Sequence, residues 1–308
     1  MSLVVALSGG VGGAKLALGL SRILPPEELL VVCNTGDDFE HLGLSVSPDI
    51  DTVMYTLAGL ANAELGWGRA DESWAFMETL AAIGGETWFR LGDRDLAVHV
   101  ERTRRLLAGE SLSAITAGFR SRLGILPRVV PMTDHRVRTR VRTEDGWIAF
   151  QDYFVRQQCR PVVRQIAFSG VDEARPQAEF LAALRDERLR AVVICPSNPF
   201  ISVEPILALP GVRAALKACA APVSAVSPII AGRAVKGPTA KMMAELGLDV
   251  SAAGVAARYG DLLDGYVVDH ADAASVPGAT AARTLMTTIE DRENLARVVL
   301  DLADIARG

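Results

Sequence analysis

Five short apolar runs constrain the fold of this chain more than any other feature. They are LVVAL at 3–7, LLVVC at 29–33, AVVIC at 191–195, VSAVS at 223–227 and YVVD at 266–269. Continuous runs rich in β-branched residues are typical of strands that helices cover on both faces, and such strands form parallel sheets. We therefore predict an α/β fold with a Rossmann-like, mostly parallel sheet and helices on both faces.

Helical periodicity fills the stretches between these runs. Apolar residues recur at three- and four-residue spacings in the segments 14–23, 49–60, 72–83, 96–107, 176–187 and 290–306. A chain of 308 residues with 50% hydrophobic content can bury one large core. We expect a single domain spanning 1–308.

A different pattern occupies the middle of the chain. Residues 137–143 alternate as VRTRVRT, and after the Glu-Asp-Gly turn at 144–146 the chain continues as WIAFQDYFV. This pattern indicates a β-hairpin, so we predict a smaller α+β lobe inserted at about 112–170. One strand face would carry a row of arginines, as a solvated edge, a subunit contact or an anion site: Arg136, Arg138, Arg140 and Arg142.

Charge and cysteine content exclude several classes of function. A formal net charge of −5 argues against a nucleic-acid partner. The four cysteines show no CxxC spacing, so neither a zinc knuckle nor a disulfide framework is indicated. The first apolar run is followed by glycines rather than a cleavage site, and no apolar run reaches membrane-spanning length. We expect a cytoplasmic protein with no membrane partner.

The sequence SGGVGGAK at 8–15 places four glycines between the first predicted strand and the first predicted helix. Backbone N–H groups at such a junction favour an anion. The dinucleotide template fails, because Lys15 stands at its sixth position and the second strand ends in Cys33-Asn34-Thr35 without an acid. The GK[ST] of a P-loop is also missing. The loop predicts another phosphate-bearing ligand, with a tightly packed turn as the alternative.

Carboxylates crowd the loop after the second strand, where the sequence reads NTGDDFEHLGLSVSPDIDT at 34–52. Loops at the carboxyl ends of parallel strands are where such sheets bind ligands. Several carboxylates beside a phosphate repel it unless a cation intervenes, and Mg²⁺ bridging carboxylates and phosphates resolves that conflict. Asp38 and Asp51 are the candidate ligands, whereas Asp49 could serve only the dipole of its own helix.

Three further segments offer polar side chains. FRLGDRDLAVH at 89–99 presents Arg90, whose guanidinium matches a phosphate or a polar ring edge, while we expect His99 to be merely packed or exposed. CPSNPFIS at 195–202 presents Ser197 and Asn198 after a buried strand, and a glycine-bearing turn, SPIIAGRAVKGPTAKM, follows the next strand. A nucleotide lying across the carboxyl edge of the sheet explains these turns together.

A series of motifs follows in order along the chain: GGVGGAK, NTGDD, SPDIDTVMY, GWG, RLGDRD, VVPMTD, FQDYFV, CPSNPFIS, VSPIIAG, KGPTAKM and TLM. Together they resemble the 2-phospho-L-lactate transferase (CofD) family of coenzyme F420 biosynthesis. The resemblance extends from residue 3 to about residue 296. Cys195 stands where that family often has glycine.

The resemblance implies a Mg²⁺-dependent transferase acting on Fo, 7,8-didemethyl-8-hydroxy-5-deazariboflavin. The terminal ribityl hydroxyl of Fo would attack the phosphorus next to the organic acid of a guanosine diphosphate-type donor, giving F420-0 or its dehydro or glyceryl analogue and GMP. The transferred group would be 2-phospholactyl, phosphoenolpyruvyl or 3-phosphoglyceryl, and the residues do not distinguish these acids. The resemblance also implies a homodimer.

By motif, Asp51 and Arg90 would contact Fo, and Asp38 and Asp51 would bind Mg²⁺ and act in catalysis. The guanosine diphosphate portion would contact Gly9, Gly10, Gly12, Gly13, Lys15, Asn34, Ser197 and Asn198. Phosphoryl transfer depends chiefly on positioning and charge neutralisation, which agrees with this set. We expect Asp51→Ala to abolish product formation and leave folding intact. The alternative is a noncatalytic nucleotide-binding regulator, which would need no Fo pocket.

Overall fold

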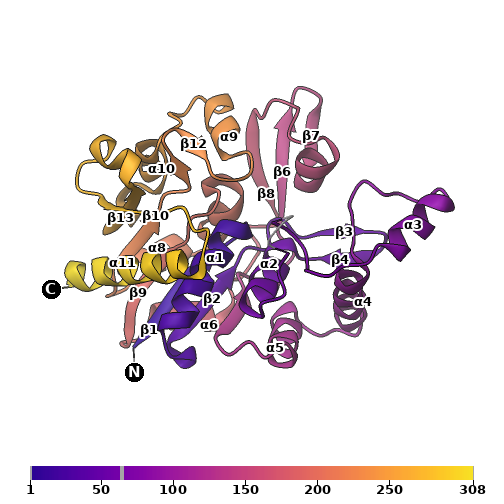
Figure 1. Ribbon diagram of the computed structural model, residues 1–308, viewed down its shortest axis with the longest axis horizontal. Coiled ribbons are helices and arrows are strands. Elements are labelled where there is room, and N and C mark those ends of the chain that lie inside the picture. The colour runs from indigo at the N-terminus through magenta and orange to yellow at the C-terminus, as the bar shows by residue number, and fades with distance from the viewer. Residues whose placement is uncertain (1, 63–65, 308) are drawn as a thin grey trace.

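The computed structural model describes residues 2–62 and 66–307. Its centre is a seven-stranded sheet in the order β14-β13-β10-β9-β1-β2-β5, in which every neighbouring pair is parallel (Figure 1). The strands are β1 (Leu3–Ser8), β2 (Leu29–Cys33), β5 (Arg128–Pro131), β9 (Leu189–Ile194), β10 (Val223–Val226), β13 (Gly265–Asp269) and β14 (Thr280–Ala282). The five apolar runs form the inner strands, and the predicted fold class is confirmed.

Helices cover both faces of this sheet. Along β1 the side chains alternate between two apolar layers, with Val4 and Ala6 in one and Val5 and Leu7 in the other. The first layer lies under α1 (Gly10–Ile23), α2 (Pro48–Leu57), α5 (Leu112–Arg122) and α11 (Ile289–Arg307). The second lies under α6 (Ala178–Leu184), α7 (Glu204–Leu207), α8 (Val212–Ala218), α9 (Thr239–Glu245) and α10 (Ala252–Tyr259). Burial on both faces explains why the strands read as continuous apolar runs.

Two helices lie beyond the edge of the sheet. α4 (Asp93–Leu107) lies beside β4 (Leu44–Val46), and α3 (Ala75–Ala82) lies farther out, at the right-hand tip of Figure 1. The six predicted helices are all present with shifted ends. In particular α1 begins at Gly10, so Gly10, Gly12 and Gly13 belong to its first turn and Gly9 caps it. The helices α5, α7, α8, α9 and α10 lie outside the predicted set.

Small antiparallel sheets flank the central one. β3 (Phe39–His41) pairs with β4, β11 (Ile229–Ile230) pairs with β12 (Arg233–Ala234), and a three-stranded sheet has the order β7 (Gly146–Ala149), β6 (Arg138–Thr143), β8 (Gln165–Ser169). The predicted hairpin is therefore β6–β7. The solvated-edge interpretation of the arginine row is wrong, because β6 lies between two partners. The stretch 112–170 is divided, since α5 and β5 belong to the central sheet and its helices.

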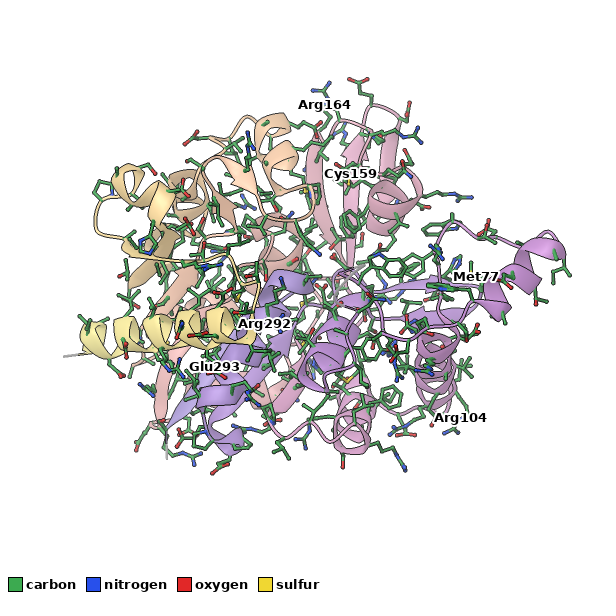
Figure 2. All side chains as sticks on the ribbon, in the orientation of Figure 1. Met77, Arg104, Cys159, Arg164, Arg292 and Glu293 are labelled. Carbon is green, nitrogen blue, oxygen red and sulfur yellow. The ribbon has the colours of Figure 1, made fainter. Side chains whose placement is uncertain are left out.

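The two ends of the chain lie on the same side of the molecule, where α11 packs along α1 (Figures 1 and 2). Glycine is required at this crossing, because a Cβ on Gly19 would lie 2.1 Å from the Arg292 carbonyl oxygen. Among the described residues no single helix is long and apolar enough to cross a membrane. One bent pair, Pro199–Leu207 with Val212–Ala218, passes by length and composition alone, and its apolar side chains lie in the core.

Candidate functional site

The glycine loop packs tightly against the segment that follows β9. The Ser197 hydroxyl donates to the Gly9 carbonyl oxygen at 2.8 Å and accepts from the Gly9 N–H at 3.3 Å. A Cβ on Gly12 would lie 2.2 Å from the Pro196 carbonyl oxygen, and a Cβ on Gly13 would lie 2.7 Å from Ser197 Oγ. Close approach of the two loops therefore requires glycine at both positions.

Gly12→Ala should destabilise the protein by about 2 kcal/mol, because the added methyl group meets backbone rather than a movable side chain. Urea unfolding measures the effect. Ser21→Ala, which adds no atom to the same helix, is the matched control and should change stability by less than about 0.5 kcal/mol. Equal stability of the two variants would mean that the loops separate freely.

Asp49 joins the start of α1 to the end of β2. Its Oδ1 accepts from the Gly10 N–H at 2.7 Å, and its Oδ2 accepts from Asn34 Nδ2 at 2.8 Å. Asn34 Nδ2 also donates to the Ile201 carbonyl oxygen at 3.1 Å, and Asn34 Oδ1 accepts from the Gly36 N–H at 2.8 Å. Asp49 thus does more than interact with the dipole of its own helix, because it bonds α1 and the residue that follows β2. The side-chain hydrogen bonds of Asn34 hold the loops together.

The remaining predicted nucleotide contacts divide between two places. Asn198 Oδ1 accepts from the Phe200 N–H at 2.9 Å and so shapes the turn that presses on the glycine loop. Lys15 extends to the other side of α1, where Nζ donates to the Met286 carbonyl oxygen at 2.8 Å. Burial lowers the pKa of Lys15, and the nearby Arg292 and Lys236 lower it further. Three cations thus lie close enough to repel one another, which favours binding of an anion here.

Four aspartates lie buried at the carboxyl edge of β2 and the start of α2, namely Asp37, Asp38, Asp49 and Asp51. Burial raises the pKa of Asp38 to about 7 and that of Asp49 to about 6. Burial, with the charge of Asp49, raises the pKa of Asp37 well above its ordinary value. Burial therefore disfavours carboxylate charge here, and a bound cation would offset that penalty.

The oxygens that such a cation would use accept no hydrogen bond from the described residues, although Asp51 Oδ2 lies 3.7 Å from His99 Nδ1. Asp38 Oδ2 accepts from the Ser47 hydroxyl at 2.8 Å, whereas Asp38 Oδ1 and Asp51 Oδ2 are buried without a hydrogen-bond donor. After burial, the charges of Arg138 and Arg102 oppose the rise in the pKa of Asp38, and the charge of Asp51 adds to it. Unsatisfied carboxylate oxygens in this setting suit Mg²⁺, which prefers oxygen ligands.

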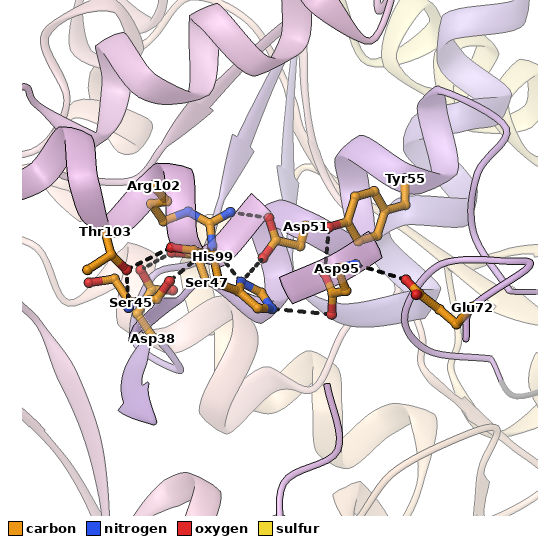
Figure 3. A network of polar contacts seen from close by, with 10 residues as sticks. All are labelled: Asp38, Ser45, Ser47, Asp51, Tyr55, Glu72, Asp95, His99, Arg102 and Thr103. Atoms are coloured by element: carbon orange, nitrogen blue, oxygen red, sulfur yellow. Dashed lines mark hydrogen bonds and ion pairs between the residues drawn. The ribbon is translucent and has the colours of Figure 1, made fainter. Parts of the chain in front are cut away.

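A buried polar network surrounds Asp51 (Figure 3). Arg102 Nη2 donates to Asp51 Oδ1, and Arg102 Nη1 lies 3.2 Å from His99 Nδ1. His99 Nε2 lies 3.2 Å from Asp95 Oδ2, and the Tyr55 hydroxyl donates to Asp95 Oδ1 at 2.6 Å. Arg102 is only 1% exposed, so its charge depends on Asp51 for compensation.

This ion pair changes one expectation. Removing the Asp51 carboxylate leaves the Arg102 guanidinium buried without an anion, so Asp51→Ala should lower stability as well as activity. Asp51, Asp95 and His99 also bring ligand atoms within 4.8 Å of one another. The nitrogens of His99 already contact Arg102 and Asp95, and Mg²⁺ prefers oxygen ligands, so this group is a poorer Mg²⁺ site than the oxygens of Asp38 and Asp51.

Asp95, His99 and Arg102 were not among the predicted site residues, although His99 is far from merely packed. Their spacing could have indicated a shared site, because residues at i, i+4 and i+7 lie on one face of a helix. In the structure this face of α4 is turned toward α2. Arg90 lies outside this network. It is exposed, and its guanidinium stacks 4.1 Å from the ring centre of Trp74, just before α3.

Comparison with known proteins agrees with the resemblance seen in the motifs. The model of the family described as 2-phospho-L-lactate transferase CofD matches residues 4–305. The chain belongs to the CofD family. A phosphoenolpyruvate transferase from Kitasatospora aureofaciens is 42% identical, over 99% of this chain and 98% of the relative. A 2-phospho-L-lactate transferase from Methanosarcina mazei is 38% identical, over 96% of this chain and 99% of the relative.

The fold of this CofD-family chain is shared more widely. A member of the UPF0052 family from Bacillus halodurans aligns with a TM-score of 0.64 at 15% identity, over 97% of this chain and 98% of the other. At that identity the likeness concerns the fold alone. The CofD family is a family of transferases. The chemistry of this chain must be argued from the residues of its own site.

Proposed function

We propose that this protein transfers a phospho-acid group from a guanosine diphosphate-type donor to the terminal ribityl hydroxyl of Fo, releasing GMP. The observation that carries the proposal is the pair of buried aspartates, Asp38 and Asp51, at the carboxyl edge of a parallel sheet, each with an oxygen that accepts no hydrogen bond from the described residues. The phosphoenolpyruvate transferase is the more similar of the two named relatives, so we propose phosphoenolpyruvate as the transferred acid.

Asp38 and Asp51 are proposed to hold Mg²⁺. When bound, the ion supplies charge neutralisation for the donor's phosphates. Arg102 holds Asp51 through Oδ1, while Oδ2 accepts no hydrogen bond from the described residues and lies 3.7 Å from His99 Nδ1. The Ser47 hydroxyl likewise holds Asp38 through Oδ2. Both carboxylates are thus oriented by protein groups before any ligand enters.

The glycine loop is proposed to hold the guanosine diphosphate portion through the first turn of α1. The backbone N–H groups of Gly12 and Gly13 lie at the positive end of this helix, next to Pro196 and Ser197. Lys15 supplies a cation whose depressed pKa would rise when an anion binds. In this role Asn34 and Asp49 position the loops and do not contact the nucleotide.

Fo is proposed to lie between Asp51 and the loop that precedes α4. Arg90, stacked on Trp74, presents a planar guanidinium beside an aromatic ring, a surface suited to a flat heterocycle. A regulator that binds only a nucleotide has no need of this surface. We further propose that the protein acts in the cytoplasm as a homodimer.

Mass spectrometry of the product tests the reaction and the donor together. The protein is incubated with Fo, Mg²⁺ and each guanylylated acid in turn, and both GMP and the phosphodiester are measured. We expect product with guanylylated phosphoenolpyruvate and none when Mg²⁺ is chelated. GDP binding without product from any of the three acids would instead favour the noncatalytic regulator.

A further inference from the structure

The arginine row on β6 is a feature that the proposed reaction does not yet use. Successive side chains of a strand point to opposite faces, so Arg138, Arg140 and Arg142 share one face. Thr139 and Val141, on the other face, are buried. Since β6 is the middle strand of its sheet, this face is flanked by β7 and β8 and is not a free edge.

Two of these arginines are incompletely satisfied. Arg138 Nη1 donates to the Val137 carbonyl oxygen at 2.8 Å, and Arg140 Nη2 donates to the Trp147 carbonyl oxygen at 3.1 Å. The Nε of each is buried without an acceptor, and neither side chain forms an ion pair within the described part of the chain. A buried guanidinium N–H without an acceptor is costly, so Arg138 and Arg140 each have a donor available to an anion on this face.

The Arg138 end of this face lies against the aspartate loop. The Thr139 N–H donates to the Gly36 carbonyl oxygen at 2.6 Å, and Arg136 lies 3.4 Å from Glu40. Arg138 precedes Thr139 in the strand, so it lies at the end of β6 that meets the loop carrying Asp38.

The opposite end of the same sheet points away from the site. Arg164, which pairs with Glu144, lies at the outer tip of the small sheet in Figure 2. Arg142 pairs across the strands with Gln165 near that end, and its side chain is exposed. Arg142 thus offers the same chemistry on the same strand face, away from Asp38.

We propose that Arg138, assisted by Arg140, binds the carboxylate of the phospho-acid that is transferred. The inference rests on the proposed function. Each of the three acids carries a carboxylate within a few bonds of the reacting phosphorus, and that phosphorus must lie close to Asp38. A carboxylate that enters beside buried aspartates needs a cation of its own. A guanidinium is suited to this because it donates two parallel hydrogen bonds to the carboxylate oxygens.

The test compares Arg138→Gln with Arg142→Gln as the matched control. We expect Arg138→Gln to raise the KM for the guanylylated acid about 30-fold or more, since it removes a charge-assisted contact. The Kd for GDP, measured by calorimetry, should change less than about twofold, because GDP lacks the acid. Arg138→Lys should recover part of the loss, and Arg142→Gln should match the wild type in both assays.

Several results would overturn the inference. An unchanged KM in Arg138→Gln would do so, as would an equal loss of GDP affinity, which would place Arg138 on the nucleotide. If the wild type forms no product from any donor, the proposed reaction fails. Calorimetry with free phosphoenolpyruvate and Mg²⁺ then decides the inference separately. Binding that Arg138→Gln abolishes supports it, whereas equal binding by both proteins or none by the wild type rejects it.

Discussion

Asp38→Asn should reduce the rate of product formation about 10³-fold while the protein stays folded. Asparagine keeps the shape of the side chain and can still accept from the Ser47 hydroxyl. It cannot supply the negative charge on Oδ1, the oxygen that accepts no hydrogen bond from any residue that the structure describes. Steady-state turnover with Fo at increasing Mg²⁺ measures the effect. Glu40→Gln is the control, because Glu40 is an exposed carboxylate two residues away.

Stability of the same variant gives an independent check through pH. Burial raises the pKa of Asp38 from its ordinary 3.8 to about 7, so between these values the folded protein holds a proton that the unfolded chain has released. In metal-free buffer this group therefore lowers wild-type stability as pH rises from about 4 to 7. Asp38→Asn should gain stability relative to the wild type over that interval. Full Mg²⁺-dependent activity of Asp38→Asn would contradict the role of Asp38 as a metal ligand. A stability difference between variant and wild type that does not change with pH would contradict the raised pKa of Asp38.

Much of the fold could be predicted because the information was local. The β-branched runs identified the five inner strands, and the glycines after the first run identified the junction with α1. The edge strands β5 and β14 were missed because each is short and gains its place only by pairing with a neighbour already in the sheet. Short helices such as α8 and α9 lacked enough turns to show a period.

The candidate site divides in the same way. Asp38 and Asp51 could be chosen from the sequence because carboxylates cluster after a strand. The partner of Asp51 could not be predicted from the sequence. Arg102 lies 51 positions away and contacts Asp51 only when α4 packs beside α2. Likewise the Asn34–Asp49–Gly10 bridge joins three segments through side chains that look like ligand contacts in sequence. Tertiary contacts decide which polar residues face a ligand and which hold the loops.

Arg102→Met should destabilise the protein by about 3–5 kcal/mol, because it leaves the Asp51 carboxylate buried without its cation. Methionine retains much of the apolar stem, so the loss reports on charge more than on packing. Urea unfolding measures the change. Arg104→Met is the matched control on the same helix, since Arg104 pairs with Glu101 at the surface, and it should cost less than about 1 kcal/mol.

The double variant Asp51→Asn, Arg102→Met separates the two contributions of this pair. Removing both charges should restore most of the stability lost in Arg102→Met, because a neutral side chain needs no buried cation. A loss caused by packing alone would not be rescued by Asp51→Asn. Product formation should stay absent in the double variant, since the charged ligand is gone. Recovery of stability without activity would mean that Arg102 keeps Asp51 charged for ligand binding, and that the buried charge itself does not stabilise the fold.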